Sequence, residues 1–546
     1  MTALEVEDLR VGFGTGADHR EVVGGISFSV AAGECLAIVG ESGSGKSVSA
    51  RSLIGLAGPG ARVSAAKLEL HGTDVRDFPD RRWRDIRGRE VGFILQDALV
   101  SLDPLRSVGK EISETLTLHR WGNATTRHAR VLELLELVGV PEPQLRARQL
   151  SGELSGGQRQ RALIASAIAL DPLLLIADEP TTALDVTVQA QIVDLLHETK
   201  ARGKALLVIS HDLAVVARLA DRVAVMNHGV IVEQGPTAQV LSNPKDSYTQ
   251  RLLDAVPSAH SRGTRLSPTT PSQFVSSARQ TRAATKGETL IAVDHVSKSY
   301  KGLDGVTRTV VNDVSFELGV GETLGVVGES GSGKTTVARL VLAVTEPDSG
   351  RITLKGEQWS GIAEKLRRPR RRLVTTVYQD PLSSFDPRWS AARLILDALP
   401  QDRYEGPARR ARVDELLSLV GLSADFGPRR PLQLSGGQRQ RVAIARALAP
   451  EPSVIVCDES VSALDVSIQA QVLDLLSDIQ QQLDVSYLFI SHDLGVIHHV
   501  SDRVLVMHNG RIVEQGSAGD IFEKPQDAYT KQLLSSLPRI QQVAGK

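Results

Sequence analysis

Short apolar runs recur along this chain, and turns of glycine or polar residues separate them. Most of these runs are continuous rather than alternating, as in strands that are covered on both faces of a sheet. They occupy residues 22–39, with a turn at 33–34, and residues 91–95, 173–177 and 206–210. Residues 131–138 instead place their apolar side chains at helical spacing. The pattern predicts an α/β fold.

No apolar run reaches the roughly 18–20 residues that a membrane-spanning helix needs. The best candidate, residues 162–177, is broken by Asp171 and Pro172. The first residues, MTALEVEDLRVGF, carry acids where a secretory signal needs basic residues and an apolar stretch. We therefore expect a chain that does not cross a membrane by itself.

One octapeptide, LSGGQRQR, occurs twice, at Leu154–Arg161 and at Leu434–Arg441. Each copy follows a glycine-rich loop and precedes an apolar run that ends in Asp-Glu. The second set of motifs lies about 280 residues after the first. A chain of 546 residues is too long for one core, and a repeat of this size predicts two related domains.

The two halves end alike and are joined by a segment of different composition. Residues 241–257, LSNPKDSYTQRLLDAVP, match residues 522–538, FEKPQDAYTKQLLSSLP, and each tail reads as a helix with a tyrosine anchor. Residues 258–288 are rich in Ser, Thr, Pro, Arg and Ala without an apolar period, which predicts a flexible linker. We expect domains at residues 1–257 and 289–546.

Composition and charge narrow the class of protein. A net charge of −1 and a pI near 6.9 argue against a dedicated nucleic-acid binder. We therefore interpret the Arg-rich stretches 81–89 and 365–372, and the basic residues of the linker, as solvated. Cys35 and Cys457 are the two cysteines, too few for a cysteine-ligated cluster. Both lie in apolar runs, so we expect small buried side chains in a reducing cytoplasm.

Two glycine-rich loops, GESGSGKS and GESGSGKT, fit the pattern G-x-x-x-x-G-K-[ST]. Such a loop wraps phosphate with its backbone N–H groups, and the dipole of the following helix attracts the anion. Lys46 and Lys334 are predicted to reach the β- and γ-phosphates. The hydroxyls of Ser47 and Thr335 are predicted to bind Mg²⁺.

An acidic pair ends one buried run in each half, Asp178-Glu179 and Asp458-Glu459. Two adjacent acids at the end of an apolar strand are costly without a ligand. We interpret each aspartate as part of the Mg²⁺ shell. We interpret each glutamate as the group that orients and deprotonates an attacking water.

Other positions are singled out because both halves contain them. His211 and His492 each follow the next apolar run and are predicted to contact the γ-phosphate. Gln96 and Gln379 follow another apolar segment, and their repetition marks them as functional. In LSGGQ, the serine and the glycine pair present a hydroxyl and N–H groups at the start of a helix, which suits a second anion contact in each half.

Taken in order, these motifs resemble the ATP-binding cassette (ABC) family over nearly the whole chain outside the linker. LSGGQ is highly specific for that family, whereas the phosphate loop alone marks a broad class of NTPases. The resemblance implies that each half is a RecA-like core with an antiparallel β subdomain and a helical subdomain. It also implies that Phe13 and Tyr300 stack on adenine.

The resemblance assigns the site residues in full. Catalysis falls to Glu179, Glu459, His211 and His492. The metal positions are Ser47, Gln96, Asp178, Thr335, Gln379 and Asp458. The ATP-binding positions are Gly40, Ser42, Gly43, Gly45, Lys46, Ser47 and Val48 with Ser435, Gly436, Gly437 and Gln438, and Gly328, Ser330, Gly331, Gly333, Lys334, Thr335 and Thr336 with Ser155, Gly156, Gly157 and Gln158.

In that family two cassettes close head to tail, which implies two composite ATP sites between the halves. The extensions QDALVSLDP and QDPLSSFDP and the two tails are similar to the ATPases of dipeptide and oligopeptide importers. The resemblance thus implies an ATP- and Mg²⁺-dependent subunit on the cytoplasmic face of the cell membrane. Its implied partners are two permease subunits and an extracytoplasmic peptide-binding protein, with no nucleic acid.

Three alternative functions share some of these features. The same importer class carries other cargoes, such as nickel or glutathione, or serves export. A ribosome-associated ATPase with paired cassettes shares the motifs but has a longer helical linker and lacks these tails. A DNA-repair cassette ATPase carries inserted cysteine clusters, which two lone cysteines exclude.

Overall fold

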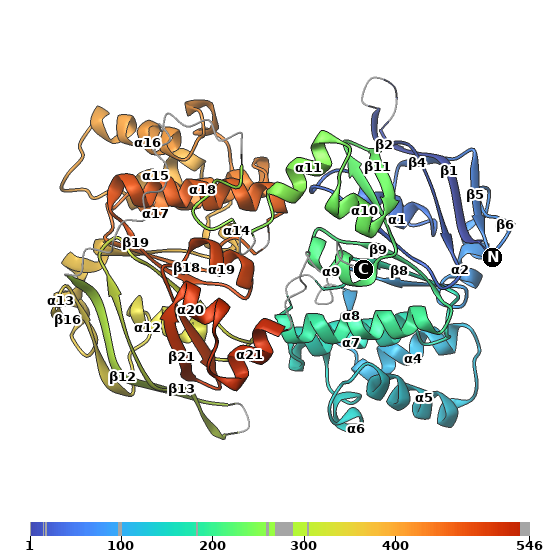
Figure 1. Ribbon diagram of the computed structural model, residues 1–546, viewed down its shortest axis with the longest axis horizontal. Coiled ribbons are helices and arrows are strands. Elements are labelled where there is room, and N and C mark those ends of the chain that lie inside the picture. Colours follow the sequence, from blue (N-terminus) through green and yellow to red (C-terminus); the bar gives the residue numbers. More distant parts are fainter. Residues whose placement is uncertain are drawn as a thin grey trace. The chain divides into compact units, whose positions relative to one another are not determined.

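The computed structural model describes residues 2–14, 16, 19–96, 101–181, 184–257, 261–267, 288–302, 305–462 and 464–535 (Figure 1). The chain divides into two compact units, and the division falls between Leu253 and Asp254. Each unit has the same plan of two sheets and their helices. We describe each unit by itself.

The first sheet of each unit is mainly antiparallel and starts with a long hairpin. In the first unit the strands are β1 (Thr2–Phe13), β2 (Arg20–Ala31), β4 (Ala61–Ser64), β5 (Lys67–Leu70) and β6 (Thr73–Asp74). In the second they are β12 (Thr289–Lys301), β13 (Thr307–Gly319), β15 (Ser349–Leu354) and β16 (Glu357–Gln358). In each unit their buried valine and leucine side chains pack on the second sheet and share a hydrophobic core with it.

The second sheet is six-stranded and mostly parallel. It contains the runs predicted at residues 35–39, 91–95, 173–177 and 206–210, whereas residues 22–31 of the first run belong to β2 of the antiparallel sheet. In the first unit its order is β11 (Val230–Pro236), β10 (Arg222–Asn227), β3 (Cys35–Val39), β9 (Ala205–Ile209), β8 (Leu174–Asp178) and β7 (Val91–Ile94). In the second the order is β21 (Arg511–Ser517), β20 (Arg503–His508), β14 (Thr323–Val327), β19 (Ser486–Ile490), β18 (Val454–Asp458) and β17 (Val374–Val377). Strands β3, β8 and β9 are buried at every position, as expected for strands covered on both faces.

Some helices pack on the faces of this sheet, and others form a separate layer beyond it. The first unit contains α1 (Lys46–Ser52), α2 (Asp80–Ile86), α4 (Val108–Leu118), α5 (Ala124–Leu137), α6 (Pro143–Arg146), α7 (Gly156–Ala167), α8 (Val186–Ala201), α9 (Leu213–Leu219), α10 (Thr237–Ser242) and α11 (Ser247–Asp254). The second contains α12 (Lys334–Val341), α13 (Glu364–Arg367), α14 (Pro381–Ser384), α15 (Ala391–Ala398), α16 (Pro407–Leu419), α17 (Gly436–Leu448), α18 (Val466–Leu483), α19 (Leu494–Val500), α20 (Ala518–Glu523) and α21 (Ala528–Ser535).

The helical subdomain lies between the glutamine and the LSGGQ motif of each half. In the first unit it consists of α4, α5 and α6, and Ile112 and Leu134 from α4 and α5 join a core cluster with side chains of α7 and α8. The predicted helix at residues 131–138 is the second half of α5. The expected division into a RecA-like core, an antiparallel β subdomain and a helical subdomain is confirmed.

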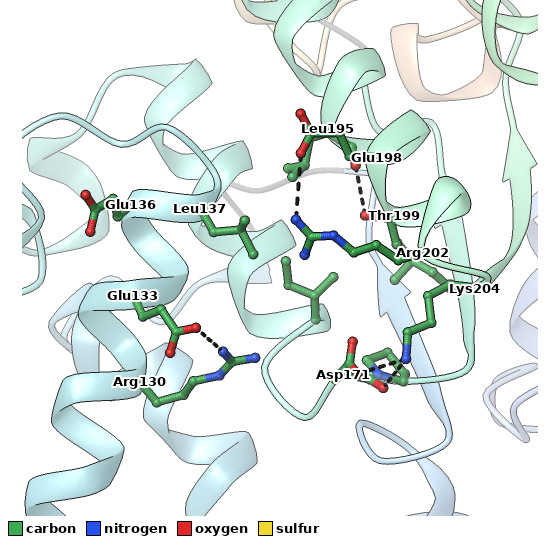
Figure 2. Close-up of a pocket in the computed structure, with 13 residues that line it drawn as sticks. Arg130, Glu133, Glu136, Leu137, Asp171, Leu195, Glu198, Thr199, Arg202 and Lys204 are labelled. Carbon is green, nitrogen blue, oxygen red and sulfur yellow. Dashed lines mark hydrogen bonds and ion pairs between the residues drawn. The ribbon is translucent and has the colours of Figure 1, made fainter.

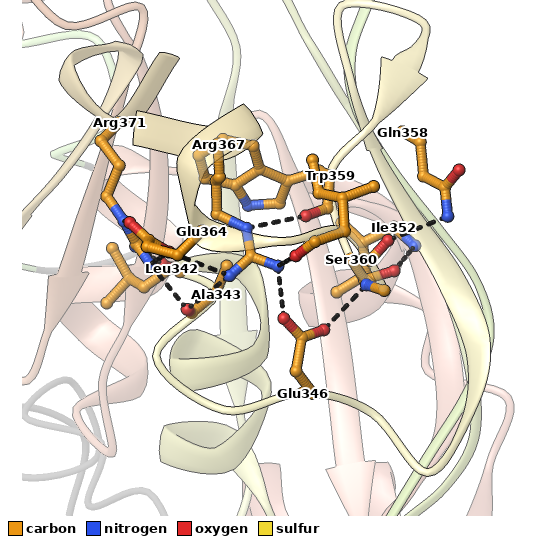
Figure 3. Close-up of polar contacts among 12 residues, drawn as sticks. Leu342, Ala343, Glu346, Ile352, Gln358, Trp359, Ser360, Glu364, Arg367 and Arg371 are labelled. Carbon is orange, nitrogen blue, oxygen red and sulfur yellow. Dashed lines mark hydrogen bonds and ion pairs between the residues drawn. The ribbon is translucent and has the colours of Figure 1, made fainter. Parts of the chain in front are cut away.

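Part of the Arg-rich stretch in the second half is buried, so its interpretation as a solvated face was wrong there. Arg367 is 4% exposed and donates a hydrogen bond to the carbonyl of Trp359 at 3.0 Å (Figure 3). It also pairs with Glu346. Arg371 donates to the carbonyls of Leu342 and Ala343, at 2.8 and 3.1 Å, just beyond the end of α12. These side chains hold the C-terminal end of the helix that follows the phosphate loop.

The first half contains an equivalent contact between an arginine and the end of the helix that follows its phosphate loop. Arg87 donates to the carbonyls of Ile54 and Gly55, at 2.8 and 3.0 Å, just beyond the end of α1. A guanidinium side chain has five fixed donors, so it can satisfy several carbonyls at a helix end. The repeated arginines in these stretches therefore have a structural role in both units.

The start of the interdomain segment is also packed. Asp474 on α18 is buried, and its carboxylate accepts hydrogen bonds from the N–H groups of Leu266 and Ser267, at 3.1 and 2.8 Å. Arg265 forms an ion pair with Asp478 at 2.8 Å. Residues 261–267 thus pack within the second unit, whereas most of the expected linker, residues 268–287, lies outside the described residues.

Candidate active site

The phosphate loops connect a buried strand to a helix, as predicted. In the first unit the loop leads from β3 to α1, and Gly45 at the helix start has φ of +99°. A Cβ atom there would lie 2.8 Å from the carbonyl oxygen of Val22 and 2.9 Å from Cε of Met226. Glycine is therefore required both by the left-handed conformation and by the close approach of β2. Gly333 has the same role in the second unit, with φ of +101°.

The lysine of each loop is held by the loop's own backbone. Lys46 is 6% exposed, and its Nζ donates to the carbonyls of Gly40 and Glu41 at 2.8 and 2.7 Å. Lys334 repeats the contact with Gly328 and Glu329 at 2.7 and 2.8 Å. The ammonium group is thus fixed within the loop whose N–H groups suit phosphate.

The aspartate of the acidic pair meets the hydroxyl that ends the loop. Ser47 donates to Oδ1 of Asp178 at 2.8 Å, and Thr335 donates to Oδ1 of Asp458 at 3.4 Å. Burial raises the pKa of Asp178 and of Asp458. The sequence predicts that the hydroxyl and the aspartate of each half bind the same metal ion. The structure places these two groups in contact.

The remaining oxygen of Asp178 fits a cation. Asp178 is fully buried, and its Oδ2 has no hydrogen-bond partner among the described residues. The guanidinium of Arg51 lies 3.8 Å away. A buried carboxylate oxygen without a hydrogen bond is costly. Where phosphate oxygens and water supply most of its ligands, Mg²⁺ needs only one or two ligands from the protein. One carboxylate and one hydroxyl meet that need.

The glutamate, histidine and glutamine meet because their strands are neighbours. Strands β7, β8 and β9 are parallel, so the residues that follow them lie at one edge of the sheet. Nδ1 of His211 lies 3.4 Å from Oε2 of Glu179, and Gln96 donates to the same oxygen at 2.9 Å. Burial lowers the pKa of His211, but the hydrogen bond and charge of Glu179 more than offset this, and the pKa lies above its usual value.

The backbone of the glutamate is strained in both units. Glu179 and Glu459 each have φ of +50°, which a residue with a side chain rarely adopts. The N–H of Glu179 is tied to the carbonyl of Ile209 at 2.9 Å, and Glu459 is tied to Ile490 in the same way. Such conformations concentrate at functional sites, where the surrounding structure fixes a side chain that must point at a reacting atom.

The second unit differs at the glutamine. Nδ1 of His492 lies 3.3 Å from Oε1 of Glu459, and this hydrogen bond lowers the pKa of Glu459. Gln379 is exposed and, in the part of the chain that the structure describes, forms no hydrogen bond with Glu459. The predicted role of Gln96 and Gln379 at the metal stays a prediction.

The LSGGQ motif starts a helix in each unit. Ser155 caps α7, since its Oγ accepts from the N–H of Gln158 at 3.3 Å while Gln158 accepts from the N–H of Ser155 at 3.1 Å. Its two glycines differ. A Cβ at Gly157 would lie 2.9 Å from Cγ1 of Val188 on α8, whereas a Cβ at Gly156 would meet nothing within 4 Å. One glycine allows helix packing, and the other leaves the backbone open for a ligand.

The two residues that are predicted to stack on adenine differ in burial. Phe13 ends β1 and packs against the core of its unit, whereas Tyr300 on β12 is 39% exposed, with the ammonium of Lys298 at 5.7 Å from its ring centre. Each lies near the end of a hairpin whose other strand approaches the phosphate loop. Their contact with adenine stays a prediction.

A pocket of the first unit lies elsewhere (Figure 2). It is lined by residues of α5, of the turn after α7, of β8, and of α8 with the turn that follows it, and no residue of the phosphate loop lines it. Most of its charged side chains pair with one another, for example Arg130 with Glu133 at 2.7 Å and Lys204 with Asp171 at 2.9 Å. Paired charges leave little free potential for a ligand, so we do not assign this pocket to the nucleotide.

The sequence motifs missed one residue at each loop. The hydroxyl of Tyr248, from the tail of the first half, accepts a hydrogen bond from the N–H of Glu41 at 3.0 Å. Tyr529 contacts Glu329 at the same distance. The signal that could have found them is the repetition of the tyrosine in the two tails, which we interpreted only as an anchor.

Comparisons with known proteins agree with this geometry. The family described as "ABC transporter" matches residues 23–182 and 311–462, more than half of the chain. The family described as "Oligopeptide/dipeptide transporter, C-terminal region" matches residues 232–279 and 513–546, at the end of each half.

Similar proteins extend over the full length. The chain is 40% identical to the oligopeptide transport ATP-binding protein OppD of Mycobacterium tuberculosis, over 98% of both chains. It is 42% identical to the peptidoglycan transport ATP-binding protein YejF of Agrobacterium fabrum, over 100% of this chain and 98% of that one. It is 40% identical to the glutathione import ATP-binding protein GsiA of Salmonella typhimurium, over 98% of this chain and 89% of that one. The chain therefore belongs to the ABC transporter family and carries two of its ATP-hydrolysing units.

Proposed function

We propose that this chain is the ATPase subunit of a membrane importer for dipeptides and oligopeptides. The observation that carries the proposal is the tail, because the peptide-transporter C-terminal region matches once in each half. The names of the similar proteins support it, since oligopeptide, peptidoglycan and glutathione transport share cargo that contains peptide bonds. Glutathione or another member of this class is the second candidate cargo.

We infer that the two halves close head to tail around two nucleotides. Site one then combines Lys46, Ser47, Gln96, Asp178, Glu179 and His211 with Ser435 and Gly437. Site two combines Lys334, Thr335, Gln379, Asp458, Glu459 and His492 with Ser155 and Gly157. The open backbone at Gly156 and Gly436, where an added Cβ meets nothing closer than 3.9 Å, supports this pairing. Phosphate of the opposite site can approach such a surface closely.

At each site the chain's own groups have separable tasks. The loop N–H groups and the lysine bind the β- and γ-phosphates, and Glu179 or Glu459 accepts a proton from the attacking water. His211 or His492 holds that glutamate and is placed to contact the γ-phosphate. The metal-binding groups are Ser47 with Asp178, and Thr335 with Asp458. When bound there, Mg²⁺ neutralises charge on the phosphates.

We further propose that the chain works with two permease subunits and an extracytoplasmic binding protein, on the cytoplasmic face of the membrane. Among the residues that the structure describes, no helix has both the length and the apolar character needed to span a bilayer. A transport ATPase of this kind depends on partners that do. The helical subdomains, α4 to α6 and α15 to α16, are the surfaces that we expect the permeases to contact.

Purification of the tagged chain from detergent-solubilised membranes tests the proposal. We expect mass spectrometry to identify two multi-span permeases and a peptide-binding protein, and the variant K46A/K334A provides a control for contacts that depend on nucleotide. Ribosomal proteins without a membrane partner would contradict the transport function. A binding protein that retains glutathione rather than longer peptides would favour the second candidate cargo.

A further inference from the structure

The tail of each half reaches the phosphate loop through one hydroxyl group. Tyr248 on α11 is 7% exposed, and its hydroxyl oxygen lies 3.0 Å from the backbone nitrogen of Glu41. Tyr529 on α21 lies 3.0 Å from the nitrogen of Glu329. Glu41 and Glu329 are the second residues of the two loops. The contact joins segments about 200 residues apart, and it recurs in both units.

The bonded N–H belongs to a peptide group that the loop lysine also holds. A peptide group is planar, so the N–H of Glu41 and the carbonyl of Gly40 point in opposite directions from one rigid unit. Lys46 donates to that carbonyl at 2.8 Å. The tyrosine and the lysine therefore fix opposite edges of the same peptide. A rotation of this peptide would break both contacts.

The tyrosine is itself positioned by the sheet that carries the loop. In the first unit, the Glu233 carboxylate on β11 accepts from the N–H groups of Lys245 and Asp246 at 2.9 and 3.1 Å. Asp246 then accepts from the N–H of Tyr248 at 2.8 Å. Strand β11 pairs with β10, which is the parallel neighbour of β3, the strand that enters the loop. The tail and the loop thus share one rigid frame.

The second unit repeats every step. Glu514 on β21 accepts from the N–H groups of Gln526 and Asp527 at 2.8 and 3.1 Å, and Asp527 accepts from the N–H of Tyr529 at 2.8 Å. The ring of His508 also stacks on Tyr529, with ring centres 3.9 Å apart. Because the backbone and the ring of Tyr529 are both already in contact with neighbours, its hydroxyl loses little conformational freedom when it makes one more hydrogen bond.

We propose that Tyr248 and Tyr529 are positioning residues that set the affinity of the two phosphate loops for nucleotide. Each hydroxyl keeps the first peptide of its loop in the orientation that holds the lysine and the neighbouring N–H groups ready for phosphate. The tail of each half is then a part of the nucleotide site rather than a cover for the edge of the sheet. The inference rests on the proposed assignment of these loops as the ATP sites.

Tyrosine-to-phenylalanine variants of the full chain test this inference. In a K46A background only the second loop is expected to bind nucleotide, and the dissociation constant of a fluorescent ADP analogue reports that loop alone. ADP avoids turnover. We expect Y529F in this background to bind about fivefold to tenfold more weakly, the effect of one lost hydrogen bond. In the otherwise wild-type chain, we expect KM for ATP to rise while kcat stays within about twofold.

A matched control removes a hydroxyl elsewhere in the same unit. Tyr404 donates to Glu451 at 2.6 Å, and neither residue belongs to the loop. Y404F should leave the dissociation constant unchanged. Thermal unfolding of each variant separates the two roles, because a purely structural tyrosine would lower Tm without weakening nucleotide binding measured well below Tm.

The reciprocal experiment makes the test independent of any one variant. Y248F in a K334A background should weaken binding at the first loop by a similar factor. Unchanged dissociation constants for both Y248F and Y529F would overturn the inference. If the K46A and K334A parents bind no ADP at all, the assignment of the loops themselves fails, which is a different result.

Discussion

Nδ1 of His492 lies 3.3 Å from Oε1 of Glu459 at the edge of the second sheet, with the glutamate backbone held at φ of +50°. His211 and Glu179 form the same pair at 3.4 Å. The glutamate is thus fixed on its main chain by strand β19 or β9 and on its side chain by the histidine. The proposed role of general base needs this kind of constraint, because the oxygen of such a base must lie within hydrogen-bond reach of the water that it deprotonates.

Loss of the glutamate charge should stop hydrolysis but not binding. We expect E179Q and E459Q each to remove most of the turnover of one site, and E179Q/E459Q to lower the ATPase rate by about 10²-fold or more. The amide keeps the size of the side chain but cannot accept the proton. Phosphate release by the purified chain with its membrane partners measures the rate.

Retention of nucleotide provides the second readout for these variants. E179Q/E459Q should retain ATP through gel filtration, whereas E198Q, on the exposed face of α8, should turn over as wild type does. Wild-type turnover of E179Q/E459Q would show that other groups activate the water.

The Glu459–His492 pair predicts a pH dependence of stability. Burial lowers the pKa of His492, but Glu459 more than offsets this, and the pKa lies above the usual 6.5. The hydrogen bond from His492 keeps the pKa of Glu459 below its usual 4.5. The contribution of the pair is therefore fully present between about pH 4.5 and 6.5. It is lost as pH rises through the raised pKa of His492, or falls through the lowered pKa of Glu459.

H492Q should then lower Tm of the second unit more at pH 6 than at pH 9, by the equivalent of about 1 kcal/mol. Scanning calorimetry at the two pH values measures the difference. H128Q, at an exposed position of α5, should behave alike at both. An equal effect of H492Q at pH 6 and pH 9 would contradict the loss of charge on His492 between these two pH values.

The two glycines of LSGGQ should separate stability from activity. A Cβ at Gly437 would lie 2.5 Å from Cγ2 of Ile468, a branched side chain with little freedom to move, whereas at Gly436 the nearest atom is 3.9 Å away. We expect G437A to lower the free energy of unfolding by about 1–3 kcal/mol. We expect G436A to fold normally and yet lose most ATPase activity, because the added methyl group occupies the surface where phosphate of the other half would approach. Equal Tm values for G436A and G437A would contradict the packing difference.

The packed start of the interdomain segment predicts a stabilising role for it. Leu266 is 3% exposed, and its N–H is bonded to the buried carboxylate of Asp474. L266A should destabilise the second unit by about 2–3 kcal/mol, whereas T264A, at an exposed position, should have little effect. Thermal unfolding and the rate of proteolysis after residue 257 measure both. Wild-type stability of L266A would mean that this segment does not stay bound in solution.

Much of the fold and most of the site could be predicted because their signals are local. The buried strands are continuous apolar runs, and the candidate site residues follow directly after them. Parallel neighbours bring such residues to one edge of the sheet, so the motif order was enough to group Lys46, Asp178, Glu179 and His211. The strained φ of Glu179 carries no sequence signal, because non-glycine residues in that conformation are set by their surroundings.

The features that the sequence did not predict depend on long-range contacts. The buried Arg367 looks like any arginine in a basic stretch, and only the fold supplies Trp359 and Glu346 around it. Leu266 lies in a segment without an apolar period. The segment nevertheless packs on α18, because two of its N–H groups bond to a buried carboxylate of that helix. The hydroxyl of Tyr248 accepts a hydrogen bond from Glu41, which lies about 200 residues earlier in the chain. No local sequence pattern indicates this partner.

Peptide uptake by cells shows whether this chain drives peptide import. Cells of the source organism that lack this chain should fail to accumulate a labelled tripeptide, and the wild-type chain should restore uptake, whereas E179Q/E459Q, expressed at the same level, should not. Uptake that is unchanged when the chain is absent would contradict the proposed role in peptide import.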